Sequence, residues 1–129
     1  MPRNWNKNSS KPKPAKSSNC RLEKVFAHLQ NHYTHDIPLS IVAEIAGMTE
    51  VSFSRFVKKR TGKTFIEILN EIRLGHASRM LIETTQSIAE IAYKNGFNNL
   101  SYFNRVFKTK HNSTPKEFRE NYSGAKTFI

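Results

Sequence analysis

Two stretches of the sequence place an arginine and, three residues later, a lysine at matched positions. Arg55 and Lys58 in the first stretch return as Arg105 and Lys108 in the second, at a shift of 50 residues. An arginine guanidinium can donate two parallel hydrogen bonds to O6 and N7 of a guanine, whereas a lysine near the end of a helix more often contacts a phosphate. Each pair therefore suits a surface that contacts both base edges and the backbone of a nucleic acid.

The residues around each arginine fit the same chemistry. Apolar side chains recur at helical spacing and predict a buried face, which turns the polar residues outward; they are Phe53, Phe56, Val57, Phe103, Val106 and Phe107. On the outward face an asparagine can bind adenine and an aliphatic group can touch a thymine methyl. We predict that the base-reading residues are Val51, Ser54, Arg55, Leu100, Ser101, Asn104 and Arg105, and that Lys58, Lys59 and Lys108 contact phosphates.

Each of these stretches follows a short segment that also occurs twice. Residues 42–48 match residues 91–97 at a shift of 49. In both copies an alanine, Ala43 or Ala92, stands four residues before a glycine, Gly47 or Gly96. A helix-turn-helix needs a small residue where its helices cross and a turn residue that tolerates positive φ. The pattern therefore predicts two helix-turn-helix motifs.

Capping signals mark where the helices begin and end. Three Ser/Thr-x-x-Glu capping boxes stand at 64–67, 87–90 and 114–117, and Thr49 and Asn99 are N-cap residues for the two outward-facing helices. An apolar stripe from residue 20 predicts a first helix, and Pro38 predicts the start of a second. The helix of residues 64–83 is expected to have a single buried face, formed by Phe65, Ile68, Leu69, Ile72, Ala77, Met80 and Leu81.

These elements predict an all-α fold of seven helices, in which two helix-turn-helix subdomains are joined by a long linker helix. We expect a disordered basic tail at 1–19, a DNA-binding domain at 20–123 and a C-terminal tail at 124–129. The subdomains are placed at about 20–62 and 84–123, with the linker helix at about 64–83. That helix would span roughly 30 Å, close to the ~34 Å between successive major grooves on one side of B-DNA.

Composition favours a polyanionic partner. The 129 residues carry a net charge of +11; residues 1–20 hold five bases and no acid, so the remainder still has an excess of six positive charges. Such a surface attracts nucleic acid, here double-stranded DNA. No apolar run approaches the ~20 residues of a membrane span, and the single cysteine, Cys20, excludes an intramolecular disulfide. We expect a cytoplasmic, nucleoid-associated protein.

Two other readings compete with sequence-specific DNA binding. His28, His32 and His35 lie at i, i+4 and i+7, near Cys20 and Asp36, but no second ligand pair has the spacing for a zinc site. Without a catalytic constellation, a phosphate loop or a cofactor motif, we expect no enzyme, no metal and no cofactor. The stronger alternative is a nonspecific or architectural DNA-binding protein, which would bind all sequences alike and lose affinity steeply with salt.

At these residues the chain resembles the DNA-binding domain of the AraC/XylS family of bacterial transcription regulators. The resemblance covers about residues 21–122. It is carried in the second half by Ser87-Ile88-x-Glu90-Ile91-Ala92, Gly96-Phe97, Ser101-Tyr102-Phe103-x-Arg105-x-Phe107-Lys108 and Thr114-Pro115-x-Glu117-Phe118-Arg119, and in the first half by Phe56-Val57-Lys58-Lys59-x-Thr61-Gly62 and Ile72-Arg73-Leu74-x-x-Ala77-x-x-Leu81-Ile82.

The resemblance implies a two-subdomain, seven-helix domain that activates transcription by contacting promoter DNA and RNA polymerase. It also implies that the residues named above read bases. One departure is His111-Asn112, where the family usually has glycine after the second recognition helix; asparagine tolerates the left-handed conformation, so we expect the C-cap to survive. Many members carry a separate sensor domain. None is present in this sequence, which leaves a fragment of a longer regulator or a small stand-alone regulator as alternatives.

Overall fold

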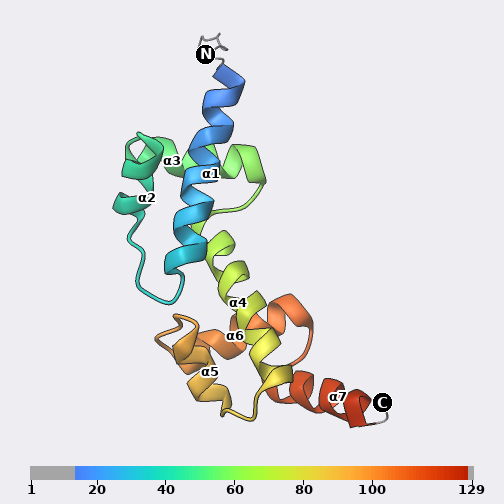
Figure 1. The fold of residues 1–129 in the computed structure, drawn as a ribbon. Helices are drawn as coiled ribbons and strands as arrows, with labels where there is room; N and C mark the ends of the chain where they lie inside the picture. The colour runs from blue at the N-terminus through green and yellow to red at the C-terminus, as the bar shows by residue number, and fades with distance from the viewer. Residues whose placement is uncertain (1–13, 128–129) are drawn as a thin grey trace, which may run out of the picture.

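The computed structural model describes residues 14–127, and within that range every regular element is an α-helix. Figure 1 shows an elongated molecule in which α1, α2 and α3 gather at one end, α5, α6 and α7 gather at the other, and α4 runs between them. The helices are α1 (Pro14–His32), α2 (Leu39–Ala46), α3 (Glu50–Thr61), α4 (Phe65–Glu83), α5 (Ile88–Lys94), α6 (Leu100–His111) and α7 (Pro115–Thr127). The predicted all-α fold of seven helices is thus present in the described range.

The first and last helices are longer than predicted. The helix α1 begins at Pro14, inside the segment 1–19 that was expected to be a tail. At the other end α7 continues to Thr127, past the expected boundary at 123, since a helical glycine such as Gly124 costs only about 1 kcal/mol. Residues 1–13 of the predicted tail lie outside the described residues.

Local hydrogen bonds define the ends of the inner helices. The Thr49 side chain accepts a hydrogen bond from the backbone N–H of Ser52, and that of Asn99 accepts one from the N–H of Tyr102. Asn112 adopts φ 58° and its N–H donates to the Lys108 carbonyl at 2.8 Å, so the predicted C-cap is confirmed. Both hydrogen bonds of each predicted capping box also form, at Thr64–Glu67, Ser87–Glu90 and Thr114–Glu117.

The described residues form two hydrophobic cores. The first is formed by Val25, Leu29, Ile37, Val42, Ala43, Ala46, Phe53, Val57, Phe65 and Leu69. The second is formed by Leu74, Ala77, Leu81, Ile91, Ala92, Phe97, Phe103, Phe107 and Phe118. Because α4 gives its N-terminal half to one core and its C-terminal half to the other, this helix belongs to both subdomains.

The helix α4 does not have the single buried face that the sequence predicted. Phe65 and Leu69 enter the first core, whereas Leu74, Ala77 and Leu81 enter the second. At 3.6 residues per turn, the centres of these two groups lie roughly 130° apart around the helix axis. The prediction missed Leu74 because it assumed one continuous stripe. The two subdomains therefore pack against different sides of the linker helix.

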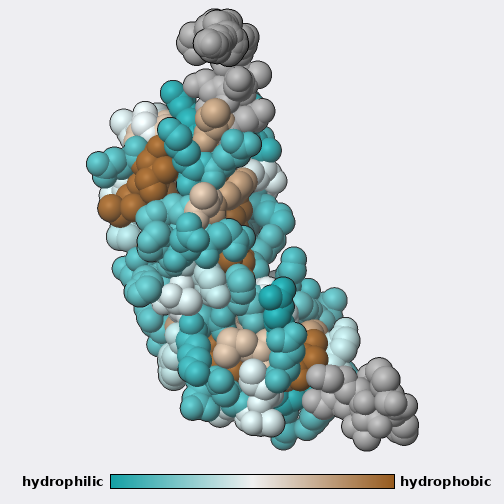
Figure 2. All heavy atoms as spheres, viewed as in Figure 1, coloured by the Kyte–Doolittle hydropathy of each residue, from teal (hydrophilic) through white to brown (hydrophobic). Residues whose placement is uncertain are grey.

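One face of the molecule is mostly hydrophilic (Figure 2). Figure 2 shows hydrophilic residues over most of the visible face, with hydrophobic areas that are small and separated. In the described part of the chain, no helix is long and apolar enough to cross a membrane.

Candidate nucleic-acid interface

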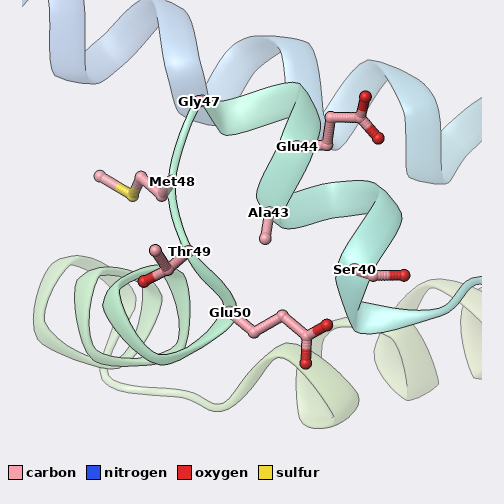
Figure 3. A pocket seen from close by; sticks show the side chains of 7 residues that line it. All are labelled: Ser40, Ala43, Glu44, Gly47, Met48, Thr49 and Glu50. Atoms are coloured by element: carbon pink, nitrogen blue, oxygen red, sulfur yellow. The ribbon is translucent and has the colours of Figure 1, made fainter.

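The first helix-turn-helix consists of α2, a turn at Gly47 and α3. Ala43 is buried where the two helices approach, and Gly47 takes φ 72° while its N–H donates to the Glu44 carbonyl. The N–H of Met48 then donates to the Ala43 carbonyl at 2.9 Å. Figure 3 shows this turn from close by, with Ala43 inside the angle between the helices. The predicted motif is present with both of its special residues in the expected roles.

The second helix-turn-helix consists of α5, a turn at Gly96 and α6. Gly96 takes φ 96°, and the Phe97 N–H donates to the Ala92 carbonyl at 3.0 Å, which repeats the bond made by Met48. This turn has an extra polar anchor, because the buried Asn95 amide donates to the Ile91 carbonyl at 2.7 Å. The two turns therefore share their backbone hydrogen bonding and differ in the side chains that stabilise it.

The predicted contact residues of α3 all lie on its exposed side. Val51 is 61% exposed although it is a large aliphatic residue, and Ser54, Arg55 and Lys59 are also exposed. Lys58 is exposed too, but its Nζ donates to the carbonyl of Gly62 at 3.1 Å, which satisfies the end of its own helix. Exposing the apolar side chain of Val51 to water is unfavourable in the free protein. The side chains of α3 that were predicted to contact bases are therefore accessible on the surface.

The predicted residues of α6 divide into two groups. Ser101, Asn104, Arg105 and Lys108 are exposed, whereas Leu100 is half-buried and packs against the second core. Ser101 is the second residue of α6, as Val51 is the second residue of α3. The structural counterpart of Val51 is therefore Ser101, and Leu100 lies at the edge between core and surface.

The Arg105 guanidinium packs against Tyr102, and Tyr102 is hydrogen-bonded to α4. Its guanidinium carbon lies 5.1 Å from the centre of the Tyr102 ring, within the range of a cation–π interaction. The Tyr102 hydroxyl in turn accepts a hydrogen bond from the Asn70 amide of α4 at 2.7 Å. The sequence predicted that Arg105 is a contact residue, but it did not predict the contacts of Tyr102 with Arg105 and Asn70. In α3 the position equivalent to Tyr102 is occupied by Ser52, so Arg55 has no matching aromatic neighbour at that position.

Charge is distributed unevenly around the recognition helices. The last turn of α3 carries Lys58, Lys59 and Arg60, and the last turn of α6 carries Lys108, Lys110 and His111. Positive charges at a helix C-terminus interact favourably with the helix dipole, and they also attract phosphates. Negative charge lies at the turn of the first helix-turn-helix, where Glu44 of α2 and Glu50 of α3 line a shallow hollow (Figure 3). Because carboxylates repel phosphates, the backbone of a bound duplex is expected along the basic helix ends.

The histidines of α1 do not form a metal site with neighbouring ligands. The rings of His28 and His32 stack with centroids 4.2 Å apart, and His32 Nδ1 lies 3.0 Å from the His28 carbonyl oxygen. Burial and the neighbouring His32 lower the pKa of His28. Among the described residues, no group of three or more His, Cys, Asp or Glu side chains could hold a metal ion.

The sequence analysis missed one polar residue that links the subdomains. Arg73 of α4 is half-buried and donates to two backbone carbonyls that follow α1, those of Tyr33 and His35. A signal was nevertheless present, because a charged residue stands next to Ile72 and Leu74 in an otherwise apolar run.

Comparison with known proteins agrees with this architecture. A family model described as "Helix-turn-helix domain" matches residues 42–121, which include both motifs. A helix-turn-helix-type transcriptional regulator from Pseudoalteromonas carrageenovora, itself uncharacterised, is 34% identical over 114 residues; these are 88% of this chain and 68% of that protein. The transcriptional activator RhaS of Enterobacter sp. is 29% identical over 104 residues, 81% of this chain but only 37% of RhaS.

Solved structures show the same fold. The C-terminal domain of AraT, a response regulator from Geobacillus stearothermophilus, superposes with a TM-score of 0.72 at 29% identity, covering 87% of this chain and 88% of that one. The DNA-binding domain of AdpA, solved in complex with a target DNA, gives a TM-score of 0.77 at 24% identity, covering 83% and 96%. With two helix-turn-helix motifs, a shared linker helix and these relatives, the chain belongs to the AraC/XylS family of sequence-specific DNA-binding transcription regulators.

Proposed function

We propose that this protein activates transcription from an asymmetric DNA site by inserting α3 and α6 into successive major grooves of one duplex. The observation that carries the proposal is the exposed face of the two helices. Arginine and lysine occupy equivalent positions in both, at 55 and 58 and at 105 and 108, while the other groove-facing residues differ. A shared basic frame with different neighbours is what two half-sites of different sequence require.

Each side chain has a role in this proposal. Arg55 and Arg105 bind guanine, Asn104 binds adenine, and Val51 touches a thymine methyl, with Ser54 and Ser101 as adaptable hydrogen-bond partners. Leu100, half-buried at the start of α6, offers only its exposed edge to a base. The phosphate contacts come from Lys58, Lys59 and Lys108, and Lys58 must leave the Gly62 carbonyl to make its contact.

The linker helix makes binding by a single chain possible. At 19 residues, α4 spans roughly 28 Å, which is comparable with the ~34 Å between successive major grooves on one side of B-DNA. A monomer with two reading helices does not need a palindromic site. Activation would involve RNA polymerase as a partner at the promoter, in the cytoplasm and on the nucleoid; support for activation comes from the similarity to RhaS, a transcriptional activator.

Selection of binding sites from random duplexes tests the proposal. We expect a bipartite site with different half-sites whose centres lie about 10 base pairs apart. If the selected pool has no common sequence, and if affinity depends on salt but not on sequence, the protein is a nonspecific or architectural DNA binder instead. A promoter carrying the selected site upstream of a reporter gene then measures activation. Unchanged or reduced transcription would contradict the activator assignment without affecting the binding assignment.

A further inference from the structure

The middle of α4 lies between the parts of this helix that enter the two cores. The last buried residue of the first core on this helix is Leu69, the partly buried Ile72 also packs against that core, and the second core begins at Leu74. Along this segment the buried side of the helix switches from the face toward the first core to the face toward the second. Arg73 lies in this segment. A bend or rotation of α4 at this place would change the position of α6 relative to α3.

Arg73 connects three parts of the molecule. Its Nε donates to the Tyr33 carbonyl at 2.7 Å and its Nη2 donates to the His35 carbonyl at 2.8 Å. Its guanidinium carbon also lies 5.9 Å from the centre of the Phe97 ring, in the turn of the second helix-turn-helix. Hydrogen bonds from a charged donor are stronger than neutral ones, and these two compensate for the partial burial of the guanidinium. One side chain of the linker therefore holds the first subdomain against the second.

The glycine of the second turn completes this junction. A Cβ on Gly96 would collide with the carbonyl oxygen of Tyr33 and would lie 2.7 Å from Arg73 Nε. Gly47, at the equivalent turn of the first subdomain, has a similar positive φ, but a Cβ there would meet nothing within 4 Å. Both glycines serve their own turns. In addition, Gly96 allows the second turn to approach the end of α1.

A stacked pair lies beside these contacts. The rings of Tyr33 and His76 are nearly parallel, with centroids 4.2 Å apart and an angle of 4° between their planes. This pair attaches the turn that follows α1 to α4, one turn beyond Arg73. The junction thus combines hydrogen bonds, a close backbone approach and ring stacking.

We propose that Arg73 and Gly96 are positioning residues that fix the angle between the two subdomains and thereby set the half-site spacing that the protein accepts. The inference rests on the proposed two-groove binding. Inserting one base pair between the half-sites moves them apart by about 3.4 Å and rotates them by about 35° around the duplex axis. A rigid junction cannot follow this change, whereas a loosened junction can. The two residues act on spacing through the recognition helices and do not themselves contact bases.

The test compares Arg73→Met with the unaltered chain on the selected bipartite duplex and on versions with one base pair added or removed between the half-sites. We expect the unaltered chain to lose about tenfold in affinity on the altered spacings, the size of one mismatched base pair. Arg73→Met should lose less than about threefold on them, a ratio well below one mismatch, because its methionine keeps apolar contact but donates no hydrogen bond. Its affinity for a duplex with one half-site should be unchanged, which also shows that the variant is folded.

A matched glycine pair gives a second, independent measurement. Gly96→Ala and Gly47→Ala both place an alanine at positive φ, so both strain a turn, but only Gly96→Ala disturbs the junction. We expect only Gly96→Ala to relax the spacing preference. The inference is overturned if Arg73→Met and Gly96→Ala keep the spacing preference of the unaltered chain. If the unaltered chain accepts all spacings equally while still needing both half-sites, the junction is not rigid and this inference fails. If one half-site alone is bound as tightly as two, the two-groove binding fails instead.

Discussion

At the scale of single residues, arginine and lysine of the recognition helices have separable roles. Arg55 and Arg105 are exposed on the sides of α3 and α6 that face away from the cores, and a guanidinium can distinguish guanine from other bases. The ammonium group of each exposed lysine is a point charge, which attracts a backbone phosphate whatever the base sequence. Specificity and general affinity should therefore respond to different substitutions.

We expect Arg55→Ala and Arg105→Ala each to weaken binding to the selected site by about 1–3 kcal/mol and to relax preference at one base pair. Lys59→Ala is the control, because it removes an exposed positive charge from the last turn of α3 without removing a predicted base contact. It should weaken binding to all duplexes similarly and reduce the salt dependence by about one unit of slope. Equal losses on selected and random duplexes for both arginine variants would contradict their base-reading role.

A second residue-scale prediction concerns His111, whose ring packs among aromatic side chains of the second core. Its centroid lies 4.4 Å from that of Phe107 and 5.0 Å from that of Phe118, and its buried Nε2 has no hydrogen-bond partner. Burial, and to a lesser extent Lys110, lower the pKa of His111 below its ordinary value of 6.5. The unfolded chain therefore binds a proton at this site more readily than the folded chain does.

The sign of the effect follows from this difference. The stability contributed by neutral His111 is fully present above about pH 6.5 and is lost as the pH falls from 6.5 toward the lower pKa of the folded state. We expect the melting temperature of the unaltered chain to decrease as the pH falls through this range. The melting temperature of the His111→Gln variant should decrease less, because glutamine does not titrate. Thermal unfolding followed by circular dichroism across this range measures both. Parallel curves for the two proteins would show that His111 does not contribute.

At the scale of elements, the linker helix contains a glycine that its position does not require. Gly75 lies inside α4, is exposed, and a Cβ there would meet nothing within 4 Å. We expect Gly75→Ala to raise the free energy of unfolding by about 0.5–1 kcal/mol, since alanine loses less backbone entropy in a helix. Gly47→Ala is the control: its Cβ also meets open space, but its φ of 72° disfavours alanine, so it should destabilise. Urea unfolding of both variants tests the prediction, and it is wrong if Gly75→Ala destabilises as well.

The sequence predicted elements well wherever the controlling interactions are local. The caps at Thr49 and Asn99 and the turn at Gly47 depend on residues within four positions of each other, and the structure has each of them as predicted. The start of α1 at Pro14 was missed because a polar, proline-containing segment gives no apolar period. The two faces of α4 were missed because an apolar pattern does not state how many cores a helix serves.

The predicted site depends on the same distinction. Exposure of Val51 and Arg55 follows from the buried spacing of Phe53 and Val57, so it could be derived from the chain alone. The bond from Arg73 to the Tyr33 carbonyl joins residues 40 positions apart, and the bond from Asn70 to Tyr102 joins residues 32 apart. No local pattern specifies either pairing. The residues predicted to face DNA could thus be derived from the sequence, whereas the residues that position them could not.

At the scale of the whole molecule, the two subdomains are built alike but should not be interchangeable on DNA. Their shared positions are in the cores and the turns, such as Phe53 and Phe103, both fully buried. Their exposed positions differ: Val51 and Ser54 correspond to Ser101 and Asn104. The order of the two half-sites should therefore matter, and a site with two copies of one half-site should bind less tightly, by about 1–3 kcal/mol for each base pair that no longer matches.

The repeat permits a test that exchanges only the groove-facing residues. The double variant Val51→Ser, Ser54→Asn gives α3 the residue types of Ser101 and Asn104 at the equivalent positions, and both positions are exposed, so the first core is left intact. Measured by competition between duplexes, this variant should prefer a site carrying two copies of the half-site bound by α6, whereas the unaltered chain should prefer the mixed site. Arg55 and Lys58 remain in place, so general affinity for DNA should be retained. A variant that still preferred the mixed site would show that these side chains do not choose the half-site, and that the difference between the subdomains must come from the turns or from the position of each helix in its groove.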